Sequence, residues 1–529
     1  MKTLPISRQL SGLIIFLALF TSCNNESENR FRLKGTLEGI TDGNIILSYA
    51  ENDKQPADTF KIEKGKFVVV GNIPKPSRYY LQVEKRTRVE FYAENARMTL
   101  KGHADSMGRS VIKGGETQTL YSEFRRRVKE LAIKHKVDDL RKELYMKTAE
   151  RDIEITRLLG KYDDDVYQLQ IDIIKENPKA YYSVELVQEL SREKNAVEIE
   201  RYLNLLDKKF ADYSEVVRLR EYVKKIKTIE VKVESLLSDA HNLSYKVDES
   251  FVCKEHNNIV YLSVLSNGNV CALKKDGGVL IIDSCGKMVK EFKSNIKTPS
   301  AITVDKSDNI YVLGSILGKK RVESRGRNKE IEVPTGVSCV VFNTKGSKIR
   351  DLKLEIIASA TGAKVFENNL IVADSKKWLI VVFDAETGIK KSVIENLYTC
   401  CNILDFCVRK ENEILVANLA SFRVDGFDYS GNRLYSFGQR GNTINDFHGC
   451  CNPVSVAFLS NGGIVTVEKD PSRIKIYSKE GAKVVEGIDE LVKGCAYIPI
   501  VVDKRDNVYL ASYAGGLIKC VPSKRGAQF

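Results

Sequence analysis

Cysteine is nearly absent from the first half of this 529-residue chain, where Cys23 stands alone before Cys253. The other eleven of the twelve cysteines lie at or beyond Cys253. No two cysteines have the C-x-x-C spacing that thioredoxin-type thiol-disulfide chemistry needs at the start of a helix. This absence excludes that chemistry. Because eleven is odd, at least one thiol of this group stays free or pairs with another molecule.

Long apolar runs are scarce as well. The run Leu13–Phe20, preceded by Lys2 and Arg8, is too short to cross a bilayer core of about 30 Å as a helix. We therefore predict a secretory signal over residues 1–22. Its end, Thr21-Ser22-Cys23, resembles the cleavage box of bacterial lipoproteins. That resemblance implies an acylated Cys23, a polar tether over residues 23–30 and an outer-membrane lipoprotein, periplasmic or surface-exposed. The alternative is an ordinary secretory peptide with a chance cysteine.

Residues 31–115 alternate between apolar and polar side chains with a period of two, as in Phe31–Gly35 and Tyr79–Val83. Gly, Asp, Asn and Pro punctuate these segments, so we predict a small antiparallel β-sandwich-like domain. The segment resembles the small β domain of unknown function that opens many envelope lipoproteins of the TlpA type. The resemblance is carried by Gly65-Lys66-Phe67, Arg88–Asn95 and Ile112–Gly115.

Glycine and proline almost disappear between Glu116 and Lys227, where Gly160 and Pro178 are the only examples. Apolar residues recur there at intervals of three and four, as at Leu120, Phe124, Val128 and Leu131. We expect four or five helices across residues 116–235, with a break before Pro178, because the residue preceding a proline resists the helical conformation. In the TlpA-type relatives a similar helical segment leads into a thioredoxin domain. Without C-x-x-C, that redox activity does not carry over to this chain.

A polar turn followed by an apolar strand occurs six times in the second half. The copies are Asn267–Val270, Asp308–Val312, Asn368–Val372, Asn412–Val416, Asn461–Val465 and Asp506–Leu510. They lie roughly 40 to 60 residues apart, which is close to the period of a four-stranded propeller blade. Each of the first five is followed by a strand that runs into a glycine-containing turn, as at Val341–Gly346. We therefore predict two hairpins per repeat and a six-bladed β-propeller over residues 240–522.

The sixth repeat stops early, soon after Leu517–Val521. An incomplete blade would leave an unpaired strand edge, which folded proteins avoid. We expect the apolar stretch Leu243–Val264 to supply the missing outer strand, so that the two ends of the region complete one blade. The segments Tyr435–Gly441, Asn452–Ala457 and Gly463–Val467 resemble NHL-repeat propellers. The resemblance implies a fold of this type and leaves its ligand open.

The cysteines of the predicted propeller form two groups. Most, such as Cys271, Cys339 and Cys407, lie within apolar strands, where cysteine acts as a small hydrophobe. The others recur just before three successive inner strands, beside one histidine: Cys400, Cys401, His448, Cys450, Cys451 and Cys495. We predict that this second group shares one face near the channel. Thiolate and imidazole would suit zinc or copper(I), and disulfides between blades are another possibility. The spacing matches no standard zinc module, so no cofactor is predicted.

Some NHL propellers are metal-dependent lyases or hydrolases. The predicted propeller offers only His256 and His448, with His241 at its boundary, which is a poor supply for a three-histidine site. Asp305 and Asp503 end strands at equivalent places in two repeats, but aspartate there is more often a turn residue. A carboxylate-based calcium or hydrolase site stays open as an alternative.

The net charge of +13 has a local peak in the second repeat. Six basic residues there outnumber Glu323, Glu330 and Glu332; they are Lys319, Lys320, Arg321, Arg325, Arg327 and Lys329. The sequence favours a solvated hairpin, and the alternatives are contact with anionic lipid, acidic glycan or an acidic partner. Nucleic acid is not expected to be a partner of an exported lipoprotein.

These patterns together predict a multidomain protein with a β domain, a helical segment and a six-bladed propeller. The expected role is that of a membrane-anchored binding or scaffold lipoprotein, without catalysis, that recognises a protein or glycan on the propeller face. The alternative is a metal-dependent propeller hydrolase or lyase. A cluster of three or more His, Asp or Glu side chains on the channel face would distinguish the two.

Overall fold

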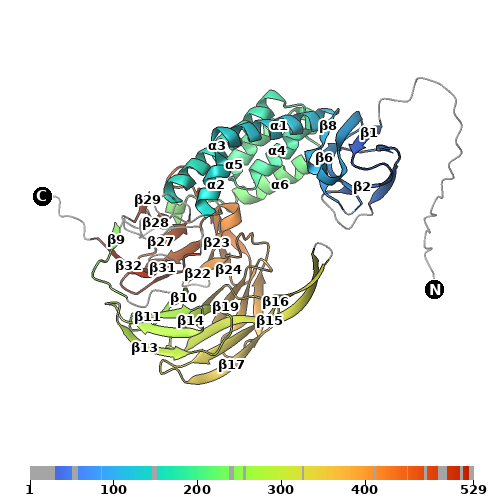
Figure 1. Cartoon of the computed structure of the whole chain (residues 1–529). Coiled ribbons are helices and arrows are strands. Elements are labelled where there is room, and N and C mark those ends of the chain that lie inside the picture. The colour runs from blue at the N-terminus through green and yellow to red at the C-terminus, as the bar shows by residue number, and fades with distance from the viewer. Residues whose placement is uncertain are drawn as a thin grey trace, which may run out of the picture. The chain divides into compact units, whose positions relative to one another are not determined.

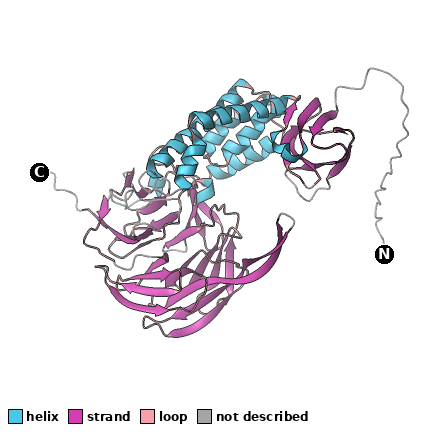
Figure 2. Ribbon diagram, in the orientation of Figure 1, coloured by secondary structure: helices cyan, strands magenta, loops and turns pink. Residues whose placement is uncertain are grey.

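The structure is a computed structural model that describes residues 30–50, 57–84, 86–145, 152–237, 244–253, 258–324, 327–409, 413–449, 451–469, 473–479, 481–485, 497–512 and 516–523. The chain divides into two compact units, Met1–Glu123 and Phe124–Phe529. The boundary falls within helix α1 (Glu116–Lys134). The predicted signal segment, Cys23 and most of the tether lie outside the described residues. Strands occur in both units, and the helices are drawn in cyan (Figure 2).

The described part of the first unit contains two four-stranded sheets, in the orders β4-β1-β7-β8 and β3-β2-β5-β6. Their strands are β1 (Phe31–Glu38), β2 (Gly43–Tyr49), β3 (Asp58–Ile62), β4 (Lys66–Gly71), β5 (Ser77–Val83), β6 (Arg88–Ala93), β7 (Arg97–His103) and β8 (Val111–Lys113). On β1 every second residue is buried, beginning with Phe31, Leu33 and Gly35. This alternation is the period-two pattern of the sequence, and it turns one face of the strand into the core.

One pairing in this unit differs from the predicted antiparallel arrangement. Strands β1 and β7 run parallel, with Leu33 opposite Met98 and Gly35 opposite Leu100. The chain between them forms β4 and all of the second sheet, so no tight hairpin constrains their relative direction. A period-two pattern identifies a strand but not the direction of the strand paired with it. The parallel pairing of β1 with β7 therefore could not be predicted from the sequence.

The second unit begins with a helical segment. With α1, the described α-helices are α2 (Val137–Tyr145), α3 (Asp152–Glu176), α4 (Tyr181–Ser191), α5 (Ala196–Leu203) and α6 (Ser214–Lys227). These six exceed the four or five expected, because Lys136 adopts a positive φ of 53° that separates α1 from α2. The predicted break at Pro178 lies between α3 and α4. No helix in the described part of the chain is long and apolar enough to cross a membrane.

Six four-stranded antiparallel sheets follow within the described residues, in a propeller-like arrangement (Figure 1). The first three contain β10 (Ile259–Val264), β11 (Val270–Lys274), β12 (Gly278–Ile282), β13 (Met288–Lys293); β14 (Pro299–Val304), β15 (Ile310–Ser324), β16 (Arg327–Phe342), β17 (Lys348–Leu354); and β18 (Gly362–Phe366), β19 (Asn369–Asp374), β20 (Leu379–Asp384), β21 (Lys390–Ile394). The last three contain β22 (Asp405–Arg409), β23 (Glu413–Asn418), β24 (Arg423–Asp428), β25 (Arg433–Phe437); β26 (Ser455–Phe458), β27 (Ile464–Glu468), β28 (Arg473–Ser478), β29 (Gly481–Val484); and β30 (Ile500–Val502), β31 (Val508–Ser512), β32 (Gly516–Pro522), β9 (Tyr245–Val247).

The sixth sheet has the origin that the sequence predicted. Strand β9 pairs antiparallel with β32, with Val247 opposite Cys520 and Tyr245 opposite Pro522. The prediction that the chain before the first repeat supplies the outer strand is confirmed. Each first strand of a sheet contacts the first strand of the next sheet, and β30 also contacts β10.

Aspartate side chains hold the turns of these sheets. Asp305 Oδ1 accepts from the backbone N–H of Ser307 and Asn309, both at 2.9 Å, and the Asn309 amide donates to Asp305 Oδ2 at 2.8 Å. Asp503 makes the same three contacts with Arg505 and Asn507. Both carboxylates are therefore turn residues with filled hydrogen-bonding positions.

The aspartates of the repeat pattern itself join neighbouring sheets. Asp506 has a positive φ of 62°, and its carboxylate accepts from Ser460 of the preceding sheet, at 2.5 Å from the backbone N and 2.7 Å from the hydroxyl. Asp308, with a φ of 63°, accepts the equivalent two bonds from Ser266. Aspartate tolerates this left-handed conformation better than most residues, which explains its place in the repeat.

Candidate functional site

The predicted cysteine face is described only in part, since Cys450 and Cys495 lie outside the described residues. Cys400 is half-buried and Cys401 is exposed in the loop before β22, and their Sγ atoms are 3.5 Å apart. Cys451 is half-buried before β26 and packs, like Cys400, against the core of the fifth and sixth sheets. The structure therefore brings Cys400 and Cys451 to one hydrophobic cluster.

Lys469 connects this region to His448. Its Nζ lies 3.6 Å from Cys401 Sγ, and its backbone O accepts from the Asn452 amide at 2.7 Å. The same Asn452 amide donates to the His448 backbone O at 2.5 Å. Within the described residues, no group of three or more His, Cys, Asp or Glu side chains is arranged to hold a metal ion.

The buried cysteines behave as predicted for apolar strands. Cys271, Cys339 and Cys407 are each less than one-tenth exposed and pack in hydrophobic clusters. Burial raises the pKa of the Cys339 thiol to about 12, and it raises the pKa of Cys271 and Cys407 as well. These thiols stay protonated and apolar at neutral pH.

A buried carboxyl lies where the first strands of the first and fourth sheets meet. Asp405 on β22 accepts at Oδ1 from the hydroxyls of Tyr261 on β10 at 3.2 Å and Tyr497 at 2.9 Å. Its Oδ2 accepts from the backbone N of Val456 on β26 at 3.3 Å. Burial raises the pKa of Asp405, against the opposing effect of the Lys364 ammonium. These contacts tie four parts of the propeller region together and satisfy the carboxyl internally.

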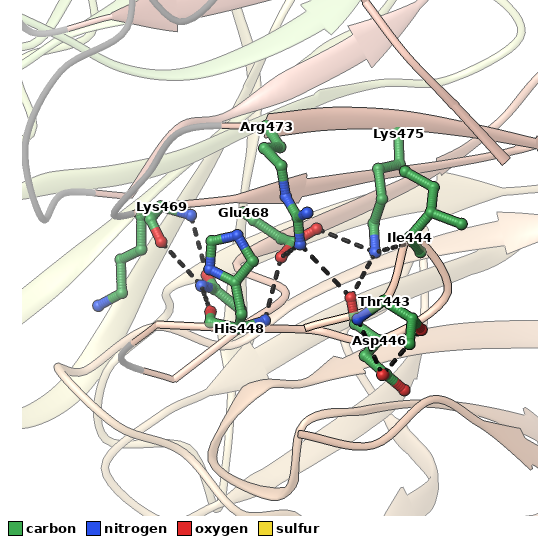
Figure 3. Close-up of polar contacts among 9 residues, drawn as sticks. Thr443, Ile444, Asp446, His448, Glu468, Lys469, Arg473 and Lys475 are labelled. Carbon is green, nitrogen blue, oxygen red and sulfur yellow. Dashed lines mark hydrogen bonds and ion pairs between the residues drawn. The ribbon is translucent and has the colours of Figure 1, made fainter. Parts of the chain in front are cut away.

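A second buried cluster lies on β27 and β28 (Figure 3). Glu468 and Lys475 are both fully buried, and Glu468 Oε1 lies 3.0 Å from Lys475 Nζ. Glu468 Oε2 accepts from Arg473 Nη2 at 2.7 Å. Lys475 also donates to the backbone O of Asp446 at 2.9 Å and of Ile444 at 3.1 Å. Burial lowers the pKa of Lys475 to about 8, although Glu468 opposes the shift.

His448 lies beside this cluster, and its backbone N donates to Glu468 Oε2 at 3.2 Å (Figure 3). Burial lowers the pKa of His448 to about 4, and the positive charge of Arg473 lowers it further in the same direction. The imidazole is therefore neutral at physiological pH. A neutral imidazole can donate at one ring nitrogen and accept at the other.

The helical segment is fastened to the fourth sheet. Arg423 on β24 donates from Nη1 to Glu230 Oε1 at 2.6 Å, and from Nη2 to the Lys194 backbone O. Residues 229–231 pair with the edge of β25, where the Ser436 backbone N donates to Ile229 O at 2.8 Å and Val231 N donates to Ser436 O at 3.0 Å. The added main-chain pairing covers part of an otherwise open strand edge.

Arg440, in the loop after β25, links the same two regions. Its Nη1 donates to Glu193 Oε2 at 2.8 Å, and its Nη2 lies 3.5 Å from Asp163 Oδ2 on α3. Lys194 Nζ donates to the Arg440 backbone O at 2.7 Å. Two carboxylates of the helical segment therefore hold the guanidinium in place.

A cleft of about 440 Å³ lies at this junction. Its charged lining comprises five cationic side chains and two carboxylates: Arg157, Lys161, Lys194, Arg440, Arg473, Asp163 and Asp164. His448 and Tyr167 also line it. Burial raises the pKa of Asp163 and lowers the pKa of Lys194. Arg440 and Arg473 are paired with Glu193 and Glu468, so the remaining positive charge comes from Arg157, Lys161 and Lys194 against Asp163 and Asp164. This smaller excess in a partly enclosed volume favours an anionic ligand.

Of the predicted site residues, His448 lines this cleft. The sequence pattern did not single out Glu468, Arg473 or Lys475. Arg473 and Lys475 alternate with apolar residues, which is also the pattern of a half-exposed strand, so the sequence did not mark them as buried. The helical contributions to the cleft could not be predicted, since they depend on contacts between segments far apart in the sequence.

Comparison with known families matches residues 31–121 to the domain of unknown function DUF4369. The predicted small β domain of unknown function is confirmed to that extent. A comparison with curated proteins finds no match.

Solved structures similar to this chain include β-propeller proteins. A streptogramin B lyase has 11% identity and a TM-score of 0.37, with 53% of this chain and 98% of that chain covered. A catalytically inactive virginiamycin B lyase from Staphylococcus aureus with quinupristin has 12% identity and a TM-score of 0.37, with 53% and 100% covered. The WD40 β-propeller domain of Doa1 has 14% identity and a TM-score of 0.35, with 54% and 98% covered.

Proposed function

We propose that this protein is an envelope lipoprotein that binds a small anionic ligand, without turnover, in the cleft between its helical segment and a closed six-bladed propeller. Acylation of Cys23 would hold it at the outer membrane. The proposal of a closed ring is supported by the pairing of β9 with β32 and the contact of β30 with β10. An NHL-type relationship would account for the repeat pattern.

The observation that carries the binding proposal is the cleft itself. Its volume of about 440 Å³ lies within the range of small-molecule sites, about 300–1,000 Å³. Guanidinium groups recognise carboxylate and phosphate in a bidentate manner. Arg440 and Arg473 are already oriented by Glu193 and Glu468, at 2.8 Å and 2.7 Å, so little side-chain entropy is lost when a ligand binds.

The proposed ligand carries a carboxylate or phosphate group on a body of monosaccharide to disaccharide size. This fits the glycan partner that the sequence suggested. Neutral His448 would contribute a hydrogen bond to an uncharged ligand hydroxyl without adding charge. Asp163 and Asp164 would hydrogen-bond to hydroxyls elsewhere on the same ligand.

Calorimetric titration of the purified chain with digalacturonic acid and with inorganic phosphate tests this proposal. We expect saturable binding of one probe, weakened about tenfold or more by Arg157→Gln/Lys161→Gln. These two exposed residues line the cleft. The matched control is Lys224→Gln/Lys225→Gln, a pair of exposed lysines on α6. Absence of binding by both probes, or equal affinity in the two variants, would reject the cleft. Consumption of a probe would favour the alternative of a hydrolase or lyase.

A further inference from the structure

The longest strands of the structure, β15 and β16, extend beyond the rest of their sheet as a two-stranded ribbon (Figure 1). Strand β17 pairs with β16 only over Val337–Phe342, so positions 316–324 and 327–336 pair with each other alone. A two-stranded hairpin by itself is marginally stable in water. Among the described residues, neither strand of the ribbon has a further strand paired to it here, and Ile316, Leu317 and Ile331 are 51%, 40% and 38% exposed.

The register divides the backbone positions of this ribbon between two faces. Positions along a strand alternate between faces, and directly paired positions share a face. Gly318 pairs with Val333 and Lys320 with Ile331, and the register continues through Val322 with Lys329 and Ser324 with Arg327. We call this set the basic face. Along these paired positions it contains no acidic residue.

The opposite face carries two cationic and three acidic positions, and we call it the mixed face. Lys319 pairs with Glu332 and Arg321 with Glu330, followed by Glu323 with Asn328. Lys319 Nζ lies 3.1 Å from Glu330 Oε2, so its charge is already partnered across the strands. The acidic residues that dilute the basic peak in the sequence are thus confined to one side.

The basic face also presents apolar side chains to solvent. Ile316 is 51% exposed and Ile331 is 38% exposed, on the side that carries Lys320. Apolar residues interleaved with cations, without acids, are typical of segments that lie in the headgroup region of an anionic membrane. The apolar side chains enter the acyl boundary while the lysines reach the headgroups.

We propose that the basic face of the β15–β16 ribbon docks on an anionic lipid surface. The ribbon would act as a second membrane contact, independent of the ligand cleft and of acylation at Cys23. Charge complementarity selects anionic lipid as the partner, and the exposed isoleucines distinguish it from a purely electrostatic contact with a soluble acidic protein.

Vesicle co-sedimentation tests the proposal, using the full chain carrying Cys23→Ser so that no acyl chain contributes. We expect binding to vesicles of phosphatidylglycerol and phosphatidylcholine, little binding to phosphatidylcholine alone, and weakening by salt. Lys320→Gln should lower partitioning about fivefold. The double variant Lys320→Gln/Ile331→Ser should lower it by more than about tenfold.

The matched control is Lys319→Gln/Leu317→Ser, which makes the same kinds of change on the mixed face. Lys319 is 70% exposed and Leu317 40% exposed, so accessibility is comparable. We expect this control to partition within about twofold of the parent chain. Failure to bind anionic vesicles, or equal losses in the two double variants, would overturn the proposal. Binding to polyglutamate but not to vesicles would assign the ribbon to an acidic protein partner instead.

Discussion

Arg423 and Glu230 form an ion pair at 2.6 Å although 193 residues separate them in the sequence. Their side chains are 5% and 16% exposed, so the pair is largely shielded from water. It joins the end of the helical segment to the fourth sheet, close to the cleft. The geometry of the cleft therefore depends on a contact that lies outside it.

Arg423→Met should destabilise the second unit by about 3 kcal/mol, because Glu230 keeps a charge that has lost its partner. Urea unfolding followed by circular dichroism measures the change. The double variant Arg423→Met/Glu230→Met should recover much of the loss, since neither charge is then left unpaired. If the double variant is as unstable as the sum of the single variants, the ion pair does not couple the two segments.

The stability of the protein should fall as pH is lowered from about 6.5 to about 4, partly through His448. The pKa of His448 is about 4 in the folded chain, against 6.5 for a histidine in water. In this window the unfolded chain binds a proton that the folded chain does not, so acid favours unfolding. His448→Gln should flatten this dependence relative to the parent chain in denaturant titrations at several pH values. An unchanged slope would place the histidine in a more solvated environment.

Gly35→Ala should destabilise the first unit by about 1–3 kcal/mol. A Cβ at Gly35 would lie 1.9 Å from the Phe67 ring, which packs across the neighbouring strand. Gly160→Ala is the matched control, because a Cβ there meets nothing within 4 Å and the residue is helical. It should raise stability by up to about 1 kcal/mol. Differential scanning calorimetry measures both, and a neutral Gly35→Ala would mean that the Phe67 ring moves aside freely.

Thiol labelling of the native protein should separate exposed from buried cysteines. Cys285 is exposed, whereas Cys271, Cys339 and Cys520 are at most 1% exposed. We expect an alkylating reagent to modify Cys285 promptly and the other three only after unfolding, when their thiolates become accessible. Peptide mass spectrometry with and without denaturant gives the result. Rapid native labelling of Cys271 would contradict the burial of β11.

Much of the fold follows from local patterns in the sequence. The six turns with their apolar strands predicted repeated four-stranded sheets. Glycine and aspartate mark turns because glycine adopts a positive φ and aspartate hydrogen-bonds to the turn backbone. The unpaired end at Leu517–Val521 predicted a strand from before the first repeat, and β9 is that strand. The scarcity of glycine and proline predicted the helical segment. Each of these inferences depends either on residues that are close in sequence or on a strand edge whose backbone groups would otherwise be unpaired.

The cleft could be predicted only in small part. His448 was identified beside the cysteines, but its neighbours Arg473 and Glu468 become relevant only through the register of β27 and β28. Arg440 and Lys194 meet across 246 residues of sequence. Likewise the net basic charge near Lys320 was visible, but its confinement to one face depends on the pairing of β15 with β16. Which of these residues lie close together depends on strand register and on contacts between distant segments. Neither can be deduced from a single sequence.

The pairing of β9 with β32 also bears on how the chain acquires its fold. Ser523 and Ser244, next to these strands, share hydrogen bonds across 279 residues. The other five sheets each consist of strands that are consecutive in the sequence. The sixth sheet forms fully only when β9 pairs with β32, which lies far along the chain. Loop closure over such a distance is entropically costly, and contacts of high sequence separation slow folding. We therefore expect completion of the sixth sheet to be the late, rate-limiting event, during which β9 needs protection from pairing with the wrong edge.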